Sequence, residues 1–269
     1  MAGAQPSTLE GKRRALLRLR LRRRREEALA RPRPARQTVS QQTVSPLVPL
    51  RPAGTKPPLF LVHAAGGSVA PYVPLAALLG DDLPVYALED PGLHGDPVEG
   101  RRLPDLAAAY LAAVREVQPD GPLYVGGWSV GGAVALDMAR QDGDVALTFV
   151  LDTAVPDAPS HPGEDELRAW FAADVADMGA EPDAAEVAER FPVFAANVRA
   201  LLTFRPSRVA GRVLLLCAEE SGPKKLDRWR AYADEIQVVR GDHYTMLQPP
   251  HIEALARTMR DGLREVSAR

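Results

Sequence analysis

From residue 59 onward, short apolar runs alternate with longer runs in which apolar residues recur every three or four positions. The longer runs predict amphipathic helices, and LPDLAAAYLAAVREVQ at 103–118 is a clear example, which Pro119 ends. The short runs are candidate strands, at 59–63, 84–89, 122–127, 145–152, 212–218 and 235–241. Uniformly apolar strands between helices are typical of a parallel sheet covered on both faces. We therefore expect one α/β domain over residues 59–269.

One interval interrupts this alternation. Between about residues 153 and 208 there is no candidate strand, only helical pieces separated by prolines: GEDELRAWFAADVADMG, DAAEVAERF and VFAANVRALLTF. In open parallel sheets, ligands bind outside the carboxyl ends of the strands. A helical insertion between two strands commonly covers that edge, so we interpret 153–208 as a lid.

The N-terminal part of the chain has a different composition. Residues 1–55 carry 13 Lys and Arg against 3 Asp and Glu, whereas the remainder is acidic. We interpret 1–36 as a basic tail, helical or disordered, in which Pro32 and Pro34 end any helix. Residues 37–58 are rich in Pro, Ser, Thr and Gln, which indicates a linker. The tail suits either a segment that docks a partner protein or a solvated basic helix at a module boundary.

Charge and cysteine content exclude several classes of protein. The acidic body and the lack of a recognition motif argue against nucleic-acid binding. No apolar run approaches the roughly 20 residues of a membrane span, and the N-terminus lacks a secretory signal, so we expect a cytoplasmic protein without a membrane partner. The single cysteine, Cys217, cannot form an internal disulfide, and no clustered His and Cys residues indicate a metal site. Its apolar surroundings predict that Cys217 is buried.

A candidate nucleophile lies in the stretch Gly127-Trp128-Ser129-Val130-Gly131, between a predicted strand and a predicted helix. This is the G-x-S-x-G pattern of the nucleophile elbow, in its required strand–turn–helix context. Glycine is needed on either side because the turn is too sharp for other side chains. A phosphate-binding turn fits less well, because the Walker lysine and the G-x-G-x-x-G order are missing. We therefore predict that Ser129 is a nucleophile in an α/β-hydrolase fold.

A serine nucleophile needs a base, which follows the serine and the acid in the chain order of α/β-hydrolases. His243 is the best candidate, because it lies in the loop between the last predicted strand and the last predicted helix. His161 falls in the lid and His251 begins the final helix, so both are expected to be structural or on the surface. His63 precedes the serine and is interpreted as a strand-end residue.

Two strand ends offer candidates for the acid that orients the base. Asp152 ends the strand after the serine helix, and Glu219 and Glu220 end the next one. Generic hydrolase architecture favours the later strand. Asp242 adjoins His243, but the side chains of sequence neighbours usually diverge, so it is expected to be structural.

An oxyanion hole should use two backbone N–H groups. Val130, directly after the serine, supplies one. The loop HAAGGS at 63–68 consists of small residues whose backbone can approach a substrate, and Ala65 is the candidate for the second donor.

Five segments in order resemble the type I thioesterase domains that end nonribosomal peptide and polyketide synthetases: PLFLVHAAGGSVAPYVPLAALLG, GWSVGG, FVLDTAVP, FAANVRALLTFRP and GDHYTML. In that family the acid follows the strand after the nucleophile helix, which implies Asp152 rather than Glu220. Type II editing thioesterases tend to carry a GHSMG-like elbow, which GWSVGG fits less well.

The resemblance implies release of an acyl or peptidyl chain from the phosphopantetheine arm of a carrier protein, through an acyl-enzyme on Ser129. Hydrolysis and cyclisation are both possible outcomes, and no bound cofactor is expected. Two alternatives share the same fold: an esterase or lipase acting on small diffusible esters, and a binding protein that has kept a hydrolase shell.

Overall fold

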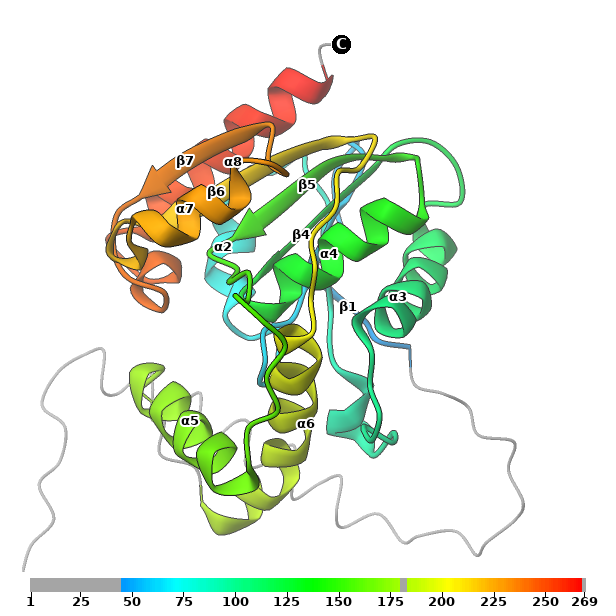
Figure 1. The fold of residues 1–269 in the computed structure, drawn as a ribbon. Helices are drawn as coiled ribbons and strands as arrows, with labels where there is room; N and C mark the ends of the chain where they lie inside the picture. The colour runs from blue at the N-terminus through cyan, green and yellow to red at the C-terminus, as the bar shows by residue number, and fades with distance from the viewer. Residues whose placement is uncertain (1–44, 180–182, 268–269) are drawn as a thin grey trace, which may run out of the picture. The chain divides into compact units, whose positions relative to one another are not determined.

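The computed structural model describes residues 45–179 and 183–267, and its centre is a seven-stranded sheet (Figure 1). The strand order is β1-β3-β2-β4-β5-β6-β7, and every neighbouring pair is parallel except β1 with β3. The strands are β1 (Leu47–Arg51), β2 (Leu59–Val62), β3 (Val85–Leu88), β4 (Leu123–Trp128), β5 (Val145–Leu151), β6 (Arg212–Ala218) and β7 (Glu235–Val239). All six predicted strands are present, within two residues of the predicted bounds.

β1 corrects the predicted start of the domain, because it lies inside the stretch 37–58 that was interpreted as a linker. It pairs antiparallel with β3 at the edge of the sheet, and its register shifts between Pro49 and Arg51. Proline has no N–H to donate and is accepted mainly on edge strands and at bulges. Pro49 therefore made this strand hard to recognise from sequence. The described residues begin at Ser45, and the predicted tail, 1–36, lies outside them.

Helices cover both faces of the sheet, as the uniformly apolar strands predicted. Alternate residues of β2 enter different cores: Phe60 and Val62 pack on the face covered by α3 and α4, and Leu59 and Leu61 on the face covered by α2 and α8. The α-helices outside the insertion described next are α2 (Tyr72–Leu78), α3 (Leu103–Val117), α4 (Val130–Gln141), α7 (Pro223–Trp229) and α8 (Ile252–Ser267). Short 3₁₀ helices occur at η1 (Pro91–His94), η2 (Glu219–Ser221) and η3 (Thr245–Leu247).

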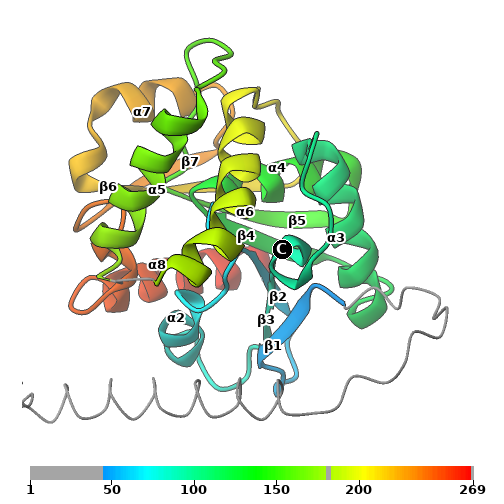
Figure 2. The same cartoon turned by 90° about the horizontal axis from the view of Figure 1, so that it is seen from below.

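Two further helices, α5 (Glu164–Asp177) and α6 (Ala184–Leu202), form the insertion between β5 and β6. They lie beyond the carboxyl ends of the strands, and Figure 2 shows both in front of the sheet. Their contact is aromatic, because the Phe171 ring of α5 packs edge-to-face against Phe191 and Phe194 of α6.

The structure differs from the sequence prediction at Pro192. Two helical pieces were expected on either side of it, yet α6 runs through it without a break. An interior proline costs a helix about 3 kcal/mol. Burial of Phe191, Val193 and Phe194 offsets this cost, at about 1.5–3 kcal/mol for each large side chain. Pro192 itself is exposed.

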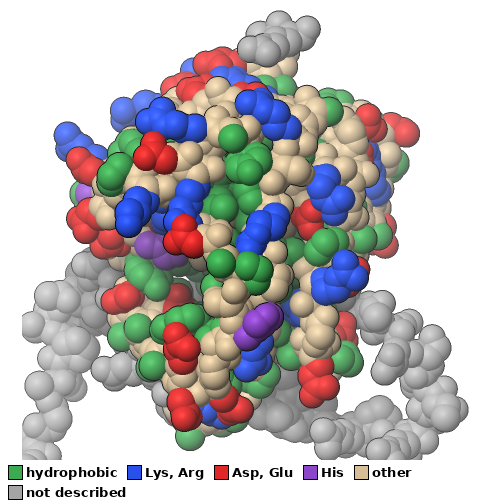
Figure 3. Space-filling view, in the orientation of Figure 1, with side chains coloured by type: hydrophobic (Ala, Val, Ile, Leu, Met, Phe, Trp, Pro, Cys, Tyr) green, Lys and Arg blue, Asp and Glu red, His purple; other side chains and the backbone are tan. Residues whose placement is uncertain are grey.

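Acidic and basic side chains are interspersed on the face of the molecule seen in Figure 3, with apolar side chains between them. Within the described residues, no helix combines the length and apolar character needed to cross a membrane. The same residues contain no group of three or more His, Cys, Asp or Glu side chains arranged to hold a metal ion.

Candidate active site

Ser129 lies at the sharp turn between β4 and α4 and has a strained backbone, with φ 58° and ψ −122°. A Cβ on Gly127 would come within 2.2 Å of the Gly131 carbonyl carbon, and one on Gly131 within 2.2 Å of the Val62 carbonyl oxygen. Neither position admits a side chain, because backbone atoms cannot give way. The steric need for both glycines, predicted from the motif, is confirmed.

Thr153 is hydrogen-bonded to the turn that carries Ser129. Its hydroxyl group donates a hydrogen bond to the Ser129 carbonyl oxygen at 2.7 Å. A Cβ on Gly132, directly after the motif, would come within 2.1 Å of the Thr153 hydroxyl oxygen and 2.9 Å of the Gly127 carbonyl oxygen, so packing requires glycine there as well. The residues that follow β5 therefore pack directly against the turn that carries Ser129.

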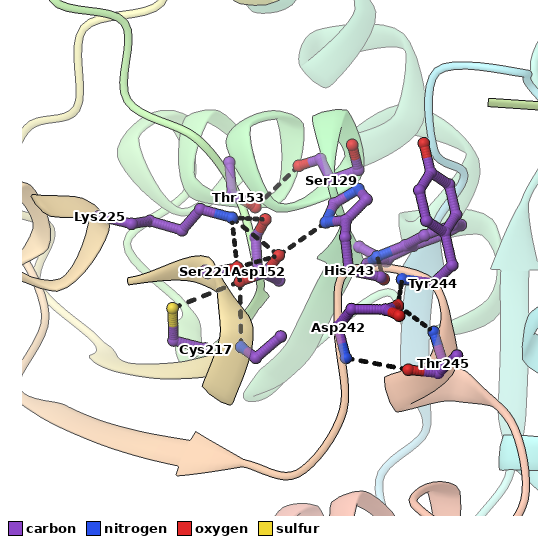
Figure 4. A network of polar contacts seen from close by, with 12 residues as sticks. Ser129, Asp152, Thr153, Cys217, Ser221, Lys225, Asp242, His243, Tyr244 and Thr245 are labelled. Carbon is purple, nitrogen blue, oxygen red and sulfur yellow. Dashed lines mark hydrogen bonds and ion pairs between the residues drawn. The ribbon is translucent and has the colours of Figure 1, made fainter. Parts of the chain in front are cut away.

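His243 and Asp152 meet beside this turn (Figure 4). The Nδ1 atom of His243 is 2.6 Å from Oδ2 of Asp152, which is fully buried. In Figure 4 the imidazole ring lies between the carboxylate and Ser129. An acid bonded to Nδ1 fixes the imidazole tautomer and leaves Nε2 for a proton from the serine. The structure thus brings Ser129, Asp152 and His243 together.

Asp152 and Ser129 share a backbone peculiarity. Among the described residues, these two are the only non-glycine residues with positive φ, which is 48° at Asp152. Such conformations cost roughly 1–3 kcal/mol each and persist where the surrounding structure enforces them, most often at functional sites. Two of the three predicted catalytic residues carry this strain.

The competing candidates lie elsewhere. Glu219 and Glu220 are exposed in η2, and His161 is exposed in the segment before α5. The carboxylate of Asp242 accepts the backbone N–H groups of Tyr244 and Thr245, each at 2.8 Å, so Asp242 shapes the histidine loop. His63 is fully buried, and burial holds its pKa below the ordinary value.

Several donors surround the carboxylate of Asp152. They are the Nδ1 of His243, the backbone N–H of Ala218, the Sγ of Cys217, the hydroxyl group of Ser221 and the ammonium group of Lys225. Burial by itself disfavours the charged carboxylate. The hydrogen bond from His243 and the charge of Lys225 outweigh that penalty and hold the pKa of Asp152 well below its ordinary value.

Lys225 and Ser221 were not identified from the sequence. The Lys225 ammonium group lies 2.7 Å from Oδ2 of Asp152 and 2.9 Å from the Ser221 hydroxyl oxygen. Gly222 and Pro223 predict a turn followed by a helix start, but nothing local indicates that the first turn of α7 faces Asp152. This contact joins residues 73 positions apart and depends on the packing of α7 against the ends of β5 and β6.

We expect Lys225→Met to lower the free energy of unfolding by about 1–3 kcal/mol, because the buried carboxylate of Asp152 loses a charged hydrogen-bond donor. Thermal unfolding near neutral pH measures this. Lys224→Met is the matched control, because Lys224 is an exposed neighbour. An equal loss of stability in both variants would instead indicate a general charge effect.

The predicted oxyanion donors lie at the adjoining ends of β2 and α4. Val130 is the first residue of α4, where N–H groups have no acceptor within the helix. Gly131 packs against the Val62 carbonyl group, so the start of α4 lies beside the loop that contains Ala65. Among the described residues, neither the Ala65 N–H nor the Val130 N–H donates a hydrogen bond to another part of the chain.

The histidine loop is held on two sides. The Trp128 indole N–H donates to the His243 carbonyl oxygen at 2.9 Å, and the two rings lie 5.0 Å apart. The Tyr244 hydroxyl group donates to Asp174 of α5 at 3.1 Å. Tyr244, which directly follows the candidate base His243, is therefore hydrogen-bonded to the insertion.

Cys217 is buried, as predicted, and its thiol donates to Oδ1 of Asp152 at 3.3 Å. Burial and the adjacent carboxylate raise the pKa of this thiol to about 12. Because the thiolate is the reactive form, we expect Cys217 to resist thiol reagents in the native protein and to react fully after denaturation. Titration with a chromogenic disulfide, with and without denaturant, measures this. Rapid labelling of the native protein would contradict it.

Comparisons with known proteins agree with this arrangement. The thioesterase domain family matches residues 57–263. The chain is 28% identical over 85% of its length to a dimodular nonribosomal peptide synthase of Bacillus subtilis, of which it covers 11%. It is 29% identical over 84% of its length to a non-reducing polyketide synthase of Cladonia metacorallifera, of which it covers 13%. The chain thus spans about a tenth of the length of these relatives.

Solved structures show the same fold. The NocB thioesterase domain in covalent complex with a fluorophosphonate nocardicin G analog is 28% identical, with a TM-score of 0.69, and the match covers 81% of this chain and 99% of that one. The Vlm2 thioesterase domain, 21% identical with a TM-score of 0.62, matches 80% of this chain and 97% of its own. The strand–turn–helix elbow, the mostly parallel sheet and the family match over most of the chain lead to one conclusion: the chain belongs to the thioesterase domain family of the α/β-hydrolase fold.

Proposed function

We propose that the chain releases an acyl or peptidyl group from the phosphopantetheine thioester of a carrier protein, through an acyl-enzyme on Ser129. The observation that carries this proposal is the Asp152–His243 pair, bonded at 2.6 Å beside a serine at a strained elbow, in a chain of the thioesterase family. The nonribosomal peptide and polyketide synthases among its relatives support a carrier-bound substrate.

In the first half-reaction, Nε2 of His243 accepts the Ser129 hydroxyl proton while the serine oxygen attacks the thioester carbonyl carbon. The backbone N–H groups of Ala65 and Val130 stabilise the negative charge that develops on the carbonyl oxygen. Collapse of the tetrahedral intermediate breaks the carbon–sulfur bond, and His243 returns its proton to the departing pantetheine thiol. An ester of Ser129 and a free thiol result.

In the second half-reaction, His243 accepts a proton from the attacking nucleophile, and the bond between the acyl carbon and the Ser129 oxygen breaks. The proton passes to Ser129 and restores the enzyme. Water as the nucleophile gives a free acid, whereas a hydroxyl or amine of the acyl chain gives a ring. Asp152 keeps Nε2 of His243 directed to the serine and stabilises the imidazolium in both halves.

The test compares one acyl group on three leaving groups: octanoyl on a phosphopantetheinylated carrier protein, on N-acetylcysteamine and on p-nitrophenol. We expect a higher kcat/KM for the two thioesters than for the ester, and an octanoyl adduct on Ser129 by intact-protein mass spectrometry. Ser129→Ala is the control and should form no adduct. Faster turnover of the ester than of both thioesters would instead favour an esterase. No adduct from any substrate would refute the acyl-enzyme.

A further inference from the structure

A group of buried polar side chains lies under the loop that carries Ala65. It comes from the end of β2, the start of η1, the segment before α3, α3 itself and α6 of the insertion. The group consists of His63, Asp90, Arg101, Tyr110 and Asn197, and we refer to it as the loop cluster. The side chain of Arg101 is 8% exposed, and the other four residues are fully buried. Buried polar groups of this kind must be hydrogen-bonded, so their partners are informative.

Asn197 links the insertion to the loop. Its Nδ2 donates to the Ala65 carbonyl oxygen at 3.0 Å and to Oδ2 of Asp90 at 2.7 Å. Its Oδ1 accepts a hydrogen bond from Arg101 at 2.9 Å. The amide orientation is determined by these partners, since a flipped amide would face two acceptors with its oxygen.

The peptide group before Ala65 is held independently. The Ala64 carbonyl oxygen accepts the Nδ1–H of His63 at 2.6 Å and the backbone N–H of Gly67 at 3.0 Å. The other ring nitrogen of His63 lies 2.7 Å from the Tyr110 hydroxyl oxygen, which supports the tautomer with hydrogen on Nδ1. The Ala65 N–H belongs to the same planar peptide group as the Ala64 carbonyl and points the opposite way. His63 and Gly67 therefore constrain that N–H from the N-terminal side of the Ala65 Cα atom.

The two peptide groups that flank Ala65 are thus fixed from different parts of the chain. His63 and Gly67 hold the first from within the loop itself. Asn197 holds the second from α6, a helix more than 130 positions away in sequence. Loss of the Asn197 bond would release one of the two constraints on the φ and ψ angles of Ala65. An oxyanion donor must be held in place before the charge develops, because its value lies in needing no reorganisation.

We propose that Asn197 is a positioning residue: by holding the Ala65 carbonyl group from the insertion, it restrains the backbone angles of Ala65 and so helps to keep the Ala65 N–H in place in the oxyanion hole. The inference rests on the proposed function, because it assumes that the Ala65 N–H binds the developing oxyanion. If Asn197 has this role, α6 of the insertion contributes a residue that supports the active site. Asp90 and Arg101 form an ion pair, and each is hydrogen-bonded to the Asn197 side chain, so together they hold that side chain in place.

The test uses Asn197→Leu, which keeps the branching at Cγ with a larger side chain and removes all three hydrogen bonds. The probe is a fluorophosphonate, with which the Ser129 oxygen displaces fluoride from phosphorus and a phosphoryl oxygen takes the oxyanion position. We expect the maximal inactivation rate constant to fall about 10- to 100-fold, with the reversible binding constant changed less than about threefold. A misplaced oxyanion donor lowers the rate of the chemical step, whereas initial probe binding does not require it.

Two further variants separate positioning from stability. Ala200→Gly weakens α6 at a buried site without a side-chain hydrogen bond to the loop, so it should lower the unfolding temperature but keep the inactivation rate constant. Asn197→Ser makes a smaller change in the same place, and it takes the place of the leucine variant if that protein does not fold. All rates are measured well below the unfolding temperature of each variant.

The outcomes distinguish the two proposals. If the wild-type protein is not labelled at Ser129, the proposed function fails. If the wild-type protein is labelled and the folded Asn197 variants react at the same maximal rate, the proposed function stands and the positioning role is refuted. A loss of rate in Ala200→Gly equal to that in the Asn197 variants would also refute it, because the effect would then come from helix stability alone.

Discussion

Replacement of Ser129 by alanine is expected to abolish thioester turnover, with kcat/KM reduced on the order of 10⁴- to 10⁶-fold. The variant lacks the attacking oxygen, whereas the backbone at φ 58° carries a Cβ in both proteins, so the strain at the elbow is unchanged. The fold should therefore persist, and circular dichroism with thermal unfolding checks this. Release of thiol from an octanoyl thioester measures the activity.

His243→Ala should lower kcat/KM by a similar factor, because the residues of a catalytic triad act as a unit. Labelling with a fluorophosphonate supplies the control: it should be stoichiometric for the wild-type protein and absent for Ser129→Ala. Full labelling of the Ser129→Ala protein would place the nucleophile elsewhere and overturn the proposed mechanism.

Asp152→Asn is expected to lower kcat about 10³- to 10⁴-fold, because an amide no longer fixes the productive tautomer of His243. It should also destabilise the fold. The buried carboxylate of Asp152 accepts hydrogen bonds from its surrounding donors, and the amide of an asparagine would oppose some of them, including the ammonium group of Lys225. Steady-state kinetics and thermal unfolding measure the two effects separately.

The stability difference between wild type and Asp152→Asn should depend on pH. The pKa of Asp152 is lower in the folded protein than in the unfolded chain, so its contribution is complete above the unfolded value and lost as pH falls toward the folded one. We therefore expect the difference in unfolding free energy to shrink below about pH 4. A difference that grows with acidification would contradict the assignment.

Glu220→Gln is the matched control for the acid, because Glu220 lies just after the next strand, in η2, and is exposed. Its kcat/KM should remain within about twofold of the wild-type value, as is usual for exposed positions that touch no special feature. A larger loss in Glu220→Gln than in Asp152→Asn would move the acid to the end of β6 and contradict the geometry of the site.

The position of the candidate nucleophile was predictable because its signal is local. Gly127, Ser129 and Gly131 lie within five residues, and the strand and the helix around them are uniformly apolar or amphipathic. His243 was predictable from chain order. Asp152 needed the family resemblance, since strand ends at 152 and 219–220 are equivalent in pattern. Only the fold shows that the first of these is buried against His243 while the second is exposed.

Lys225 and Asn197 could not be found in the same way. Each acts on a residue far away in sequence, and their surroundings, in PKKLDRW and FAANVRALL, read as ordinary helix. A buried asparagine and a solvated one have the same sequence signature. Their partners are determined by how α7 and α6 pack against the ends of the strands, which depends on many side chains at once.

The sequence by itself determined the elements whose cause lies within a few neighbouring residues: six apolar strands, the amphipathic helices between them, and the glycine-flanked turn at Ser129. Tertiary structure decided the rest. It made β1 a strand despite Pro49, because β1 pairs with β3 at the edge of the sheet, where a missing N–H is tolerated. It also continued α6 through Pro192, because burial of the adjacent side chains outweighs the cost of the proline. It also brought Lys225 to Asp152 and Asn197 to Ala65, since a buried charge or amide must find its partner across the chain once water is excluded.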